Sequence, residues 1–165
     1  MSAERLFLLD PYNDNHFVLM EDFESKNELP KTTTEILSNI RSSVSKETYI
    51  ENKKKNNDIN EILIIVQDDR IKDSCAIDGV KDRKSCTITF PSLKNRLKNR
   101  KLVTIATDYA LNTLGMQEAF TIMPIENQSI MTMLEPQGFE NLGTEGNTIM
   151  YLKEKDIQNK AQRVM

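Results

Sequence analysis

The sequence has no tryptophan, a single histidine, two cysteines and only five glycines among its 165 residues. One histidine, His16, excludes any catalytic or metal site that needs two imidazoles, and its polar surroundings predict an exposed loop or helix-start residue. Cys75 and Cys86 have no CxxC spacing and no histidine close in sequence, so we expect no metal site. A reducing compartment would keep both thiols free.

Long apolar runs are also missing. The longest, residues 62–66, is too short to span a bilayer, and the first five residues do not resemble a signal peptide. We therefore expect a cytoplasmic protein that makes no membrane contact. A net charge of −3 makes nucleic acid an unlikely main partner, although residues 94–101 are locally basic.

The composition fits one folded domain. Hydrophobic residues make up 38% of the chain and charged residues 28%, as in globular proteins. We expect a single domain over residues 1–153, with a polar tail at 154–165. Its oligomeric state, monomer or homodimer, stays open.

Hydrophobic periodicity predicts a strand, two helices, three strands, a helix, a strand, a helix and two strands. Asn13 to Asn15 offer caps for the first helix, and Thr32-x-x-Glu35 is typical of a capping box for the second. Residues 53–60 are expected to form a polar loop. Strands are expected at 5–9, 61–67, 74–77, 85–90, 119–125, 139–142 and 148–152, and the apolar run at 61–67 predicts burial on both faces or nearly so. The later helices are expected at 100–114, with Thr107 on the polar side and Gly115 as the stop, and at 129–137, ended by Gly138. This order indicates an α+β fold around one mixed sheet.

The spacing of motifs from Pro91 to Phe139 resembles the GNAT superfamily of N-acyltransferases. The matching features are the strand-ending Pro91, the helix end at 108–116, Pro124-x-x-Asn127 and Gly138-Phe139. The resemblance is greatest to the branch that acetylates ribosomal proteins and protein N-termini. It implies a three-layer α/β/α fold with a central mixed, mostly antiparallel sheet, and an acyl-CoA-binding half at about 86–139.

The same resemblance implies acetyl-CoA or another acyl-CoA as co-substrate. The residues that would bind it are the strand end, the following loop and helix start, and the motif asparagine: Thr89, Phe90, Lys94, Asn95, Arg96, Leu97, Lys98, Asn99, Arg100 and Asn127.

The phosphate-binding loop departs from the family pattern. Leu97 and Asn99 stand where the family has glycines, whose backbone can approach a pyrophosphate at a helix N-terminus. Leu97 therefore either has helical geometry with its side chain turned away, or obstructs the cofactor. The basic side chains around it could hold phosphates, or could simply form a solvated helix start.

The catalytic groups differ from the family as well. Leu134 stands where many members have a proton-donating tyrosine, and residues 87–90 offer no carboxylate as a general base. Ser129 lies one residue before the serine of the N-terminal-acetylating branch and is a candidate catalytic residue or a helix cap. Tyr151 is a candidate proton donor or a packing residue.

These features indicate an acyl-CoA-dependent N-acyltransferase in which a primary amine attacks the thioester directly and backbone amides stabilise the oxyanion. The acceptor stays open between a protein N-terminus, an amino sugar and a small amine. Two alternatives remain: a pseudoenzyme that acts as a binding or regulatory module, and a phospholigand or nucleic-acid binder that uses the basic loop.

Overall fold

A computed structural model describes residues 4–90, 96–126 and 128–155, with backbone only for 96–100 and 128–130. Its centre is a seven-stranded sheet in the order β1-β2-β3-β4-β5-β7-β6. The strands are β1 Arg5–Leu8, β2 Glu61–Gln67, β3 Arg70–Val80, β4 Ser85–Thr89, β5 Glu118–Pro124, β6 Glu140–Glu145 and β7 Thr148–Glu154. All neighbouring strands are antiparallel except β4 and β5, which are parallel.

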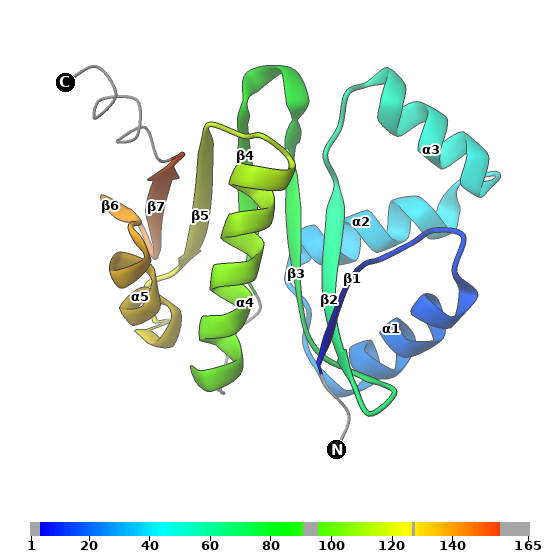
Figure 1. The fold of residues 1–165 in the computed structure, drawn as a ribbon, viewed down its shortest axis with the longest axis horizontal. Coiled ribbons are helices and arrows are strands. Elements are labelled where there is room, and N and C mark those ends of the chain that lie inside the picture. Colours follow the sequence, from blue (N-terminus) through cyan, green and yellow to red (C-terminus); the bar gives the residue numbers. More distant parts are fainter. Residues whose placement is uncertain (1–3, 91–95, 127, 156–165) are drawn as a thin grey trace.

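Helices cover both faces of this sheet (Figure 1). They are α1 Asp14–Lys26, α2 Lys31–Ser42, α3 Lys46–Lys55, α4 Arg96–Asp108 and α5 Gln128–Leu134, with short 3-10 turns at Lys81–Arg83 and Glu135–Gln137. One apolar core lies between the sheet and α4 with α5, and a second lies between the sheet and α1, α2 and α3. The three-layer α+β arrangement and the mixed, mostly antiparallel sheet predicted from the sequence are confirmed.

Strand β2 shows why the sheet needs a layer on each side. Leu63 and Ile65 belong to the α4 core, whereas Ile62 and Ile64 belong to the core under α1 and α2. Successive side chains of a strand point to opposite faces, so an unbroken apolar run requires cover on both. The prediction of a doubly buried strand at 61–67 is confirmed.

Two predictions in the first half were wrong. The expected loop at 53–60 begins with the last turn of a third helix, α3, whose N-cap Ser45 accepts a hydrogen bond from the Thr48 amide. Helix α2 has no capping box, because it starts at Lys31 after Pro30, whose restricted backbone already provides an extended N-cap. Asn13 does cap α1 as predicted.

Helix α4 starts earlier than expected, at Arg96, and ends in a π-helix over Tyr109–Thr113. There the Leu114 amide donates to the Tyr109 carbonyl oxygen at 2.9 Å. The buried positions of the helix recur about every four residues: Leu102, Val103, Ala106, Thr107, Ala110 and Leu111. Thr107, expected on the solvent side, is only 5% exposed. Gly115, with φ of +73°, ends the segment as predicted.

The core under α2 provides a test of this layer. Leu37 is fully buried there, so we expect Leu37→Ala to lower the free energy of unfolding by about 2–5 kcal/mol. Val44, just after α2, is 96% exposed, so Val44→Ala should change it by no more than about 0.5 kcal/mol. Urea denaturation of both variants measures the difference, and equal effects would contradict the packing of α2.

The two cysteines are free and buried in the α4 core. Burial raises the pKa of Cys86 to about 12, with a smaller contribution from Asp78, and also raises the pKa of Cys75. Because the thiolate is the reactive form, both should resist a thiol reagent at pH 8 in the native protein and react quickly in denaturant. Rapid labelling of the native protein would contradict this burial.

Candidate functional site

The candidate site lies where β4 and β5 separate. These parallel strands are paired only at Ser85 with Glu118, Cys86 with Ala119 and Thr87 with Phe120. Beyond these pairs β4 remains bonded to β3, and β5 remains bonded to β7. The two strands are therefore hydrogen-bonded to each other only at their amino-terminal ends, here called the paired base, and they separate toward their carboxyl ends.

Separation leaves backbone groups available. In an antiparallel ladder, alternate residues direct their N–H and C=O groups toward one neighbouring strand and the rest direct theirs away from it. On β4 after Thr87, and on β5 after Phe120, the outward-directed groups face the opening instead of a partner strand. Unpaired backbone groups of this kind are costly unless water or a ligand binds them.

Two buried hydroxyl groups, one on β5 and one on α4, have no hydrogen-bond partner among the described residues. Thr121, the first residue of β5 beyond the paired base, is fully buried, and its Oγ1 forms no hydrogen bond. Thr107 Oγ1 on α4 is likewise buried without a partner. Thr107 lies one turn after Thr104, which bonds Gln137 beyond α5, so Thr107 is on the side of α4 that faces α5. Buried hydroxyls are normally satisfied, so Thr121 Oγ1 is a candidate to bond a ligand that enters between β4 and β5.

Tyr151 lies next to Thr121, because the two are cross-strand partners on β7 and β5. The tyrosine is 2% exposed and belongs to the α4 core. Burial, with a smaller contribution from Glu135, raises the pKa of its phenol. The hydroxyl is therefore protonated at neutral pH and can act as a donor.

The start of α4 is the other side of the site. The chain leaves β4 at its carboxyl end and returns along α4 to β5, so the α4 N-terminus belongs to the open end of the strand pair. Arg96, Lys98 and Arg100 occupy its first turns, without an acidic residue in the first turn. A helix N-terminus attracts anions, and cations there are unfavourable unless an anion offsets them.

Leu97 takes the first of the two arrangements expected for its backbone. It lies inside α4, so the loop needs no glycine-like dihedral at this position. Lys101 forms an ion pair with Glu4 at 3.0 Å.

The predicted site residues are only partly placed. Thr89 ends β4, Phe90 follows it with 7% exposure, and Arg96, Leu97, Lys98, Asn99 and Arg100 form the start of α4. Ser129 is the second residue of α5, and only its backbone is described. Lys94, Asn95 and Asn127 lie outside the described residues. Leu134 is fully buried in the α4 core.

Thr107 and Thr121 are not among the site residues predicted from the sequence. The sequence does contain a signal for Thr121, since this residue occupies an inward position of β5 between the buried Ala119 and Met123. A polar residue in an otherwise apolar set of alternating positions marks either a hydrogen bond or a ligand contact. Thr107 left none, because a threonine one turn after the exposed Thr104 fits the polar side of the helix equally well.

Among the described residues, no group of histidine, cysteine and acidic side chains could hold a metal ion. No helix in that part of the chain is long and apolar enough to cross a membrane.

No protein-family model and no curated protein matches this sequence. Solved structures do resemble it. The N-acetyltransferase PseH of Campylobacter jejuni, in complex with acetyl coenzyme A, matches with a TM-score of 0.60 and 12% identity, covering 93% of this chain and 100% of that one. A dodecameric spermidine N-acetyltransferase of Vibrio cholerae matches with a TM-score of 0.61 and 13% identity, covering 94% and 95%. The chain thus has the fold of these N-acetyltransferases, as its resemblance to the GNAT superfamily led us to expect.

Proposed function

We propose that this protein is an acyl-CoA-dependent N-acyltransferase that transfers an acyl group to a primary amine. The observation that carries the proposal is the separation of β4 from β5 inside an acetyltransferase fold, with the unpartnered hydroxyl of Thr121 at the first position of β5 beyond the paired residues. A structure of the same fold binds acetyl coenzyme A. The unpaired groups here suit a ligand with amide and carbonyl functions, as the pantetheine arm of CoA has.

The residues that would bind the cofactor come from β4, β5, the start of α4 and the segment before α5. Backbone groups around Thr89 and Phe90, with Thr121 Oγ1, would bond the pantetheine arm. The start of α4, from Arg96 to Arg100, and the preceding Lys94 and Asn95 would bind the phosphates through charge and through helix N–H groups. Asn127 would support the same arm from the segment before α5.

Acetyl-CoA would supply the acyl group as a thioester. The chain's own contribution is then orientation and charge stabilisation. Unpaired N–H groups on the open edge of β4 can donate to an acyl oxygen as negative charge develops on it. The phenol of Tyr151 stays protonated because burial raises its pKa, which makes it a candidate to protonate the leaving sulfur. Ser129, at the start of α5, is a second candidate for this role.

For the amine acceptor we propose three classes of compound. Resemblance to the protein N-terminal acetyltransferase branch favours a protein or peptide N-terminus, whereas the spermidine enzyme of similar fold acts on a small amine. An amino sugar stays the third class. A cytoplasmic location and a monomeric or homodimeric state remain predictions from the sequence.

One observation favours a second function. Leu134 is a fully buried core residue, so this chain has no proton donor at the position where many related enzymes have tyrosine. A pseudoenzyme that binds acyl-CoA without turnover would make every contact described above, but it would not use Tyr151 as a proton donor. Binding and turnover must therefore be measured separately.

Binding is tested by titrating the protein with acetyl-CoA in a calorimeter and by following its thermal unfolding. We expect saturable binding, with stabilisation of about 2.7 kcal/mol at a concentration one hundred times Kd. Thr121→Val should weaken binding about tenfold without destabilising the free protein, because the free hydroxyl has no partner to lose.

Thr33→Val is the matched control. Thr33 Oγ1 is also buried and unpartnered, but it lies on α2, across the sheet from α4. This variant should bind acetyl-CoA normally. No binding of acetyl-CoA by the unaltered protein at about 1 mM would reject both the enzyme and the acyl-CoA-binding pseudoenzyme.

Turnover is tested by release of free CoA in the presence of a peptide with a free N-terminus, glucosamine or spermidine. Tyr151→Phe should lower kcat by at least about tenfold while leaving the Kd of acetyl-CoA unchanged, because only the proton is removed. An unchanged kcat would exclude Tyr151 as the donor. Binding without release of CoA for any of the three amines would favour the pseudoenzyme.

A further inference from the structure

A second hollow lies at the other edge of the sheet, between β1, the β2–β3 turn and the start of α1. It is a cavity of about 490 Å³, within the range of small-molecule sites. Arg5 and Phe7 of β1 line it, together with His16 of α1 and Asp69 of the turn. Nothing in the proposed acyl-transfer reaction uses these residues.

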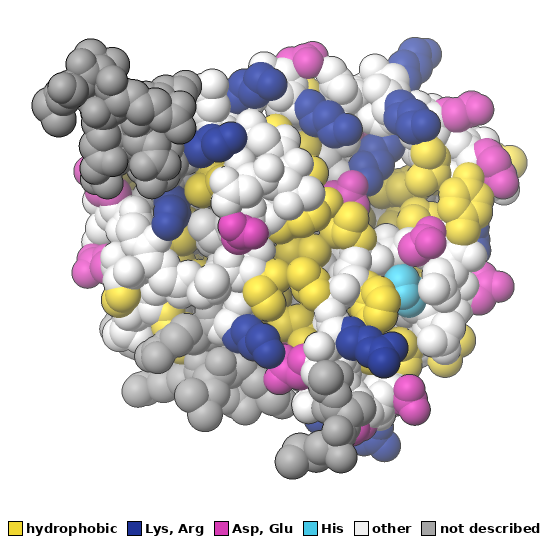
Figure 2. All heavy atoms as spheres, in the orientation of Figure 1, with side chains coloured by type: hydrophobic (Ala, Val, Ile, Leu, Met, Phe, Trp, Pro, Cys, Tyr) yellow, Lys and Arg dark blue, Asp and Glu magenta, His cyan; other side chains and the backbone are white. Residues whose placement is uncertain are grey.

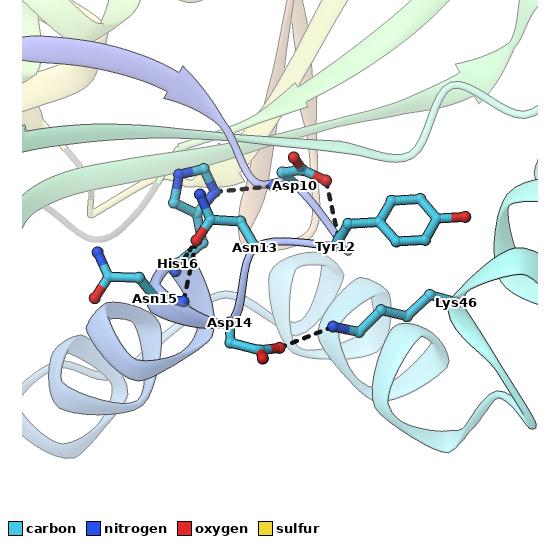
Figure 3. A network of polar contacts seen from close by, with 7 residues as sticks. All are labelled: Asp10, Tyr12, Asn13, Asp14, Asn15, His16 and Lys46. Atoms are coloured by element: carbon cyan, nitrogen blue, oxygen red, sulfur yellow. Dashed lines mark hydrogen bonds and ion pairs between the residues drawn. The ribbon is translucent and has the colours of Figure 1, made fainter.

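His16 is the best-defined group in this cavity. Contrary to the exposed position expected for it, the residue is 8% exposed, and its ring lies 5.5 Å from the ring of Phe7. Its Nδ1 accepts a hydrogen bond of 3.0 Å from the Asp10 amide (Figure 3), so the neutral ring carries its proton on Nε2. No hydrogen bond pairs Nε2 among the described residues. A space-filling view shows the imidazole at the surface, next to hydrophobic and basic side chains (Figure 2).

The His16 side of the cavity favours an anion. Nε2–H is a fixed donor, and Arg5 forms no ion pair with any described carboxylate. Asn13 Oδ1 is already occupied by the amides of Asn15 and His16, which leaves its NH₂ group as the free donor. Asn13 and His16 lie at the N-terminus of α1, where the helix dipole adds to the attraction, and Arg5 lines the same cavity from β1.

The opposite side favours a cation. Asp69 lines the cavity from the tight turn between β2 and β3, where both turn residues have positive φ. Its carboxylate is exposed and forms no ion pair within the described part of the chain. A ligand with a single charge would thus leave one of the two sides unmatched.

The remaining walls are apolar. Phe7, Leu19 and Val66 line the cavity between the two charged sides. Arg5 and Val66 are cross-strand partners, so Arg5 lies beside the apolar residues of the cavity. We propose that the cavity binds a free amino acid with an apolar side chain: the carboxylate at Arg5 and His16, the ammonium group at Asp69, and the side chain against Phe7, Leu19 and Val66.

This site is separate from the opening between β4 and β5. The sheet order places β1 three strands from β4, or about 14 Å at the usual spacing. Phe7, whose partner Ile64 belongs to the core under α1, faces α1 and not α4. The amino acid would therefore be a second ligand, distinct from an acyl acceptor at the first site.

The single histidine makes the test direct, because its imidazole gives one set of NMR signals. The unaltered protein is titrated at constant pH with L-leucine, with L-leucinamide, which lacks the carboxylate, and with N-acetyl-L-leucine, which lacks the ammonium group. We expect L-leucine to shift the His16 signals saturably, and each analogue to bind at least about tenfold more weakly.

Arg5→Gln should weaken L-leucine binding by at least about tenfold, since it removes a charged donor. Arg70→Gln is the matched control, because Arg70 is exposed on the same β2–β3 hairpin and does not line the cavity. Both variants should unfold at the same temperature as the parent. No shift with L-leucine at about 10 mM would overturn the proposal, as would an analogue that binds as tightly as L-leucine or equal effects of the two substitutions.

Discussion

Three residue pairs between β4 and β5 hold the two parts of the sheet together. On one side, β1 to β4 form an antiparallel unit; on the other, β5, β7 and β6 form a second one. Helix α4 bridges them, because its buried face packs in a core that includes residues of β2, β3, β4, β5 and β7. Apolar packing from one helix therefore replaces the ladder that is missing between the open ends of the strands.

This arrangement leaves unsatisfied polar groups at the open ends of β4 and β5. A buried hydroxyl without a partner costs about 1–3 kcal/mol, and the open strand edges add backbone groups to the hydroxyl of Thr121. Two apolar cores, one on each face of β2 and β3, contribute the folding free energy that offsets this cost. A ligand that satisfies those groups would recover part of it, which is the physical link between this fold and binding.

Much of this could be predicted from the sequence, because the signals were local. The β-branched run at 61–67 indicated a doubly covered strand, Gly115 and Gly138 marked helix ends, and Asn13 marked a helix start. Helix α3 was missed because its only buried residue is Tyr49, so it has no apolar face to detect.

The site was harder to predict than the fold. The spacing of the motifs pointed to the end of β4 and the segment after it, although α4 begins at Arg96 and not at residue 100, whereas the unpartnered hydroxyls depend on which face of an element is buried. His16 was judged from its polar neighbours in sequence, whereas its burial comes from Phe7 on a strand that only the fold brings alongside. Long-range contacts of this kind leave no trace in local composition.

The π-helix at Tyr109–Thr113 has a consequence for changes in chain length. A π-helical turn holds one residue more than an α-helical turn, so it is equivalent to a single-residue insertion in a regular helix. Losing one residue there would convert the segment to α-helix and leave the registers of α4 and β5 intact. The same loss within Leu102–Ala106 would rotate the buried face away from the sheet. Length variation between relatives of this chain should therefore collect at the end of α4.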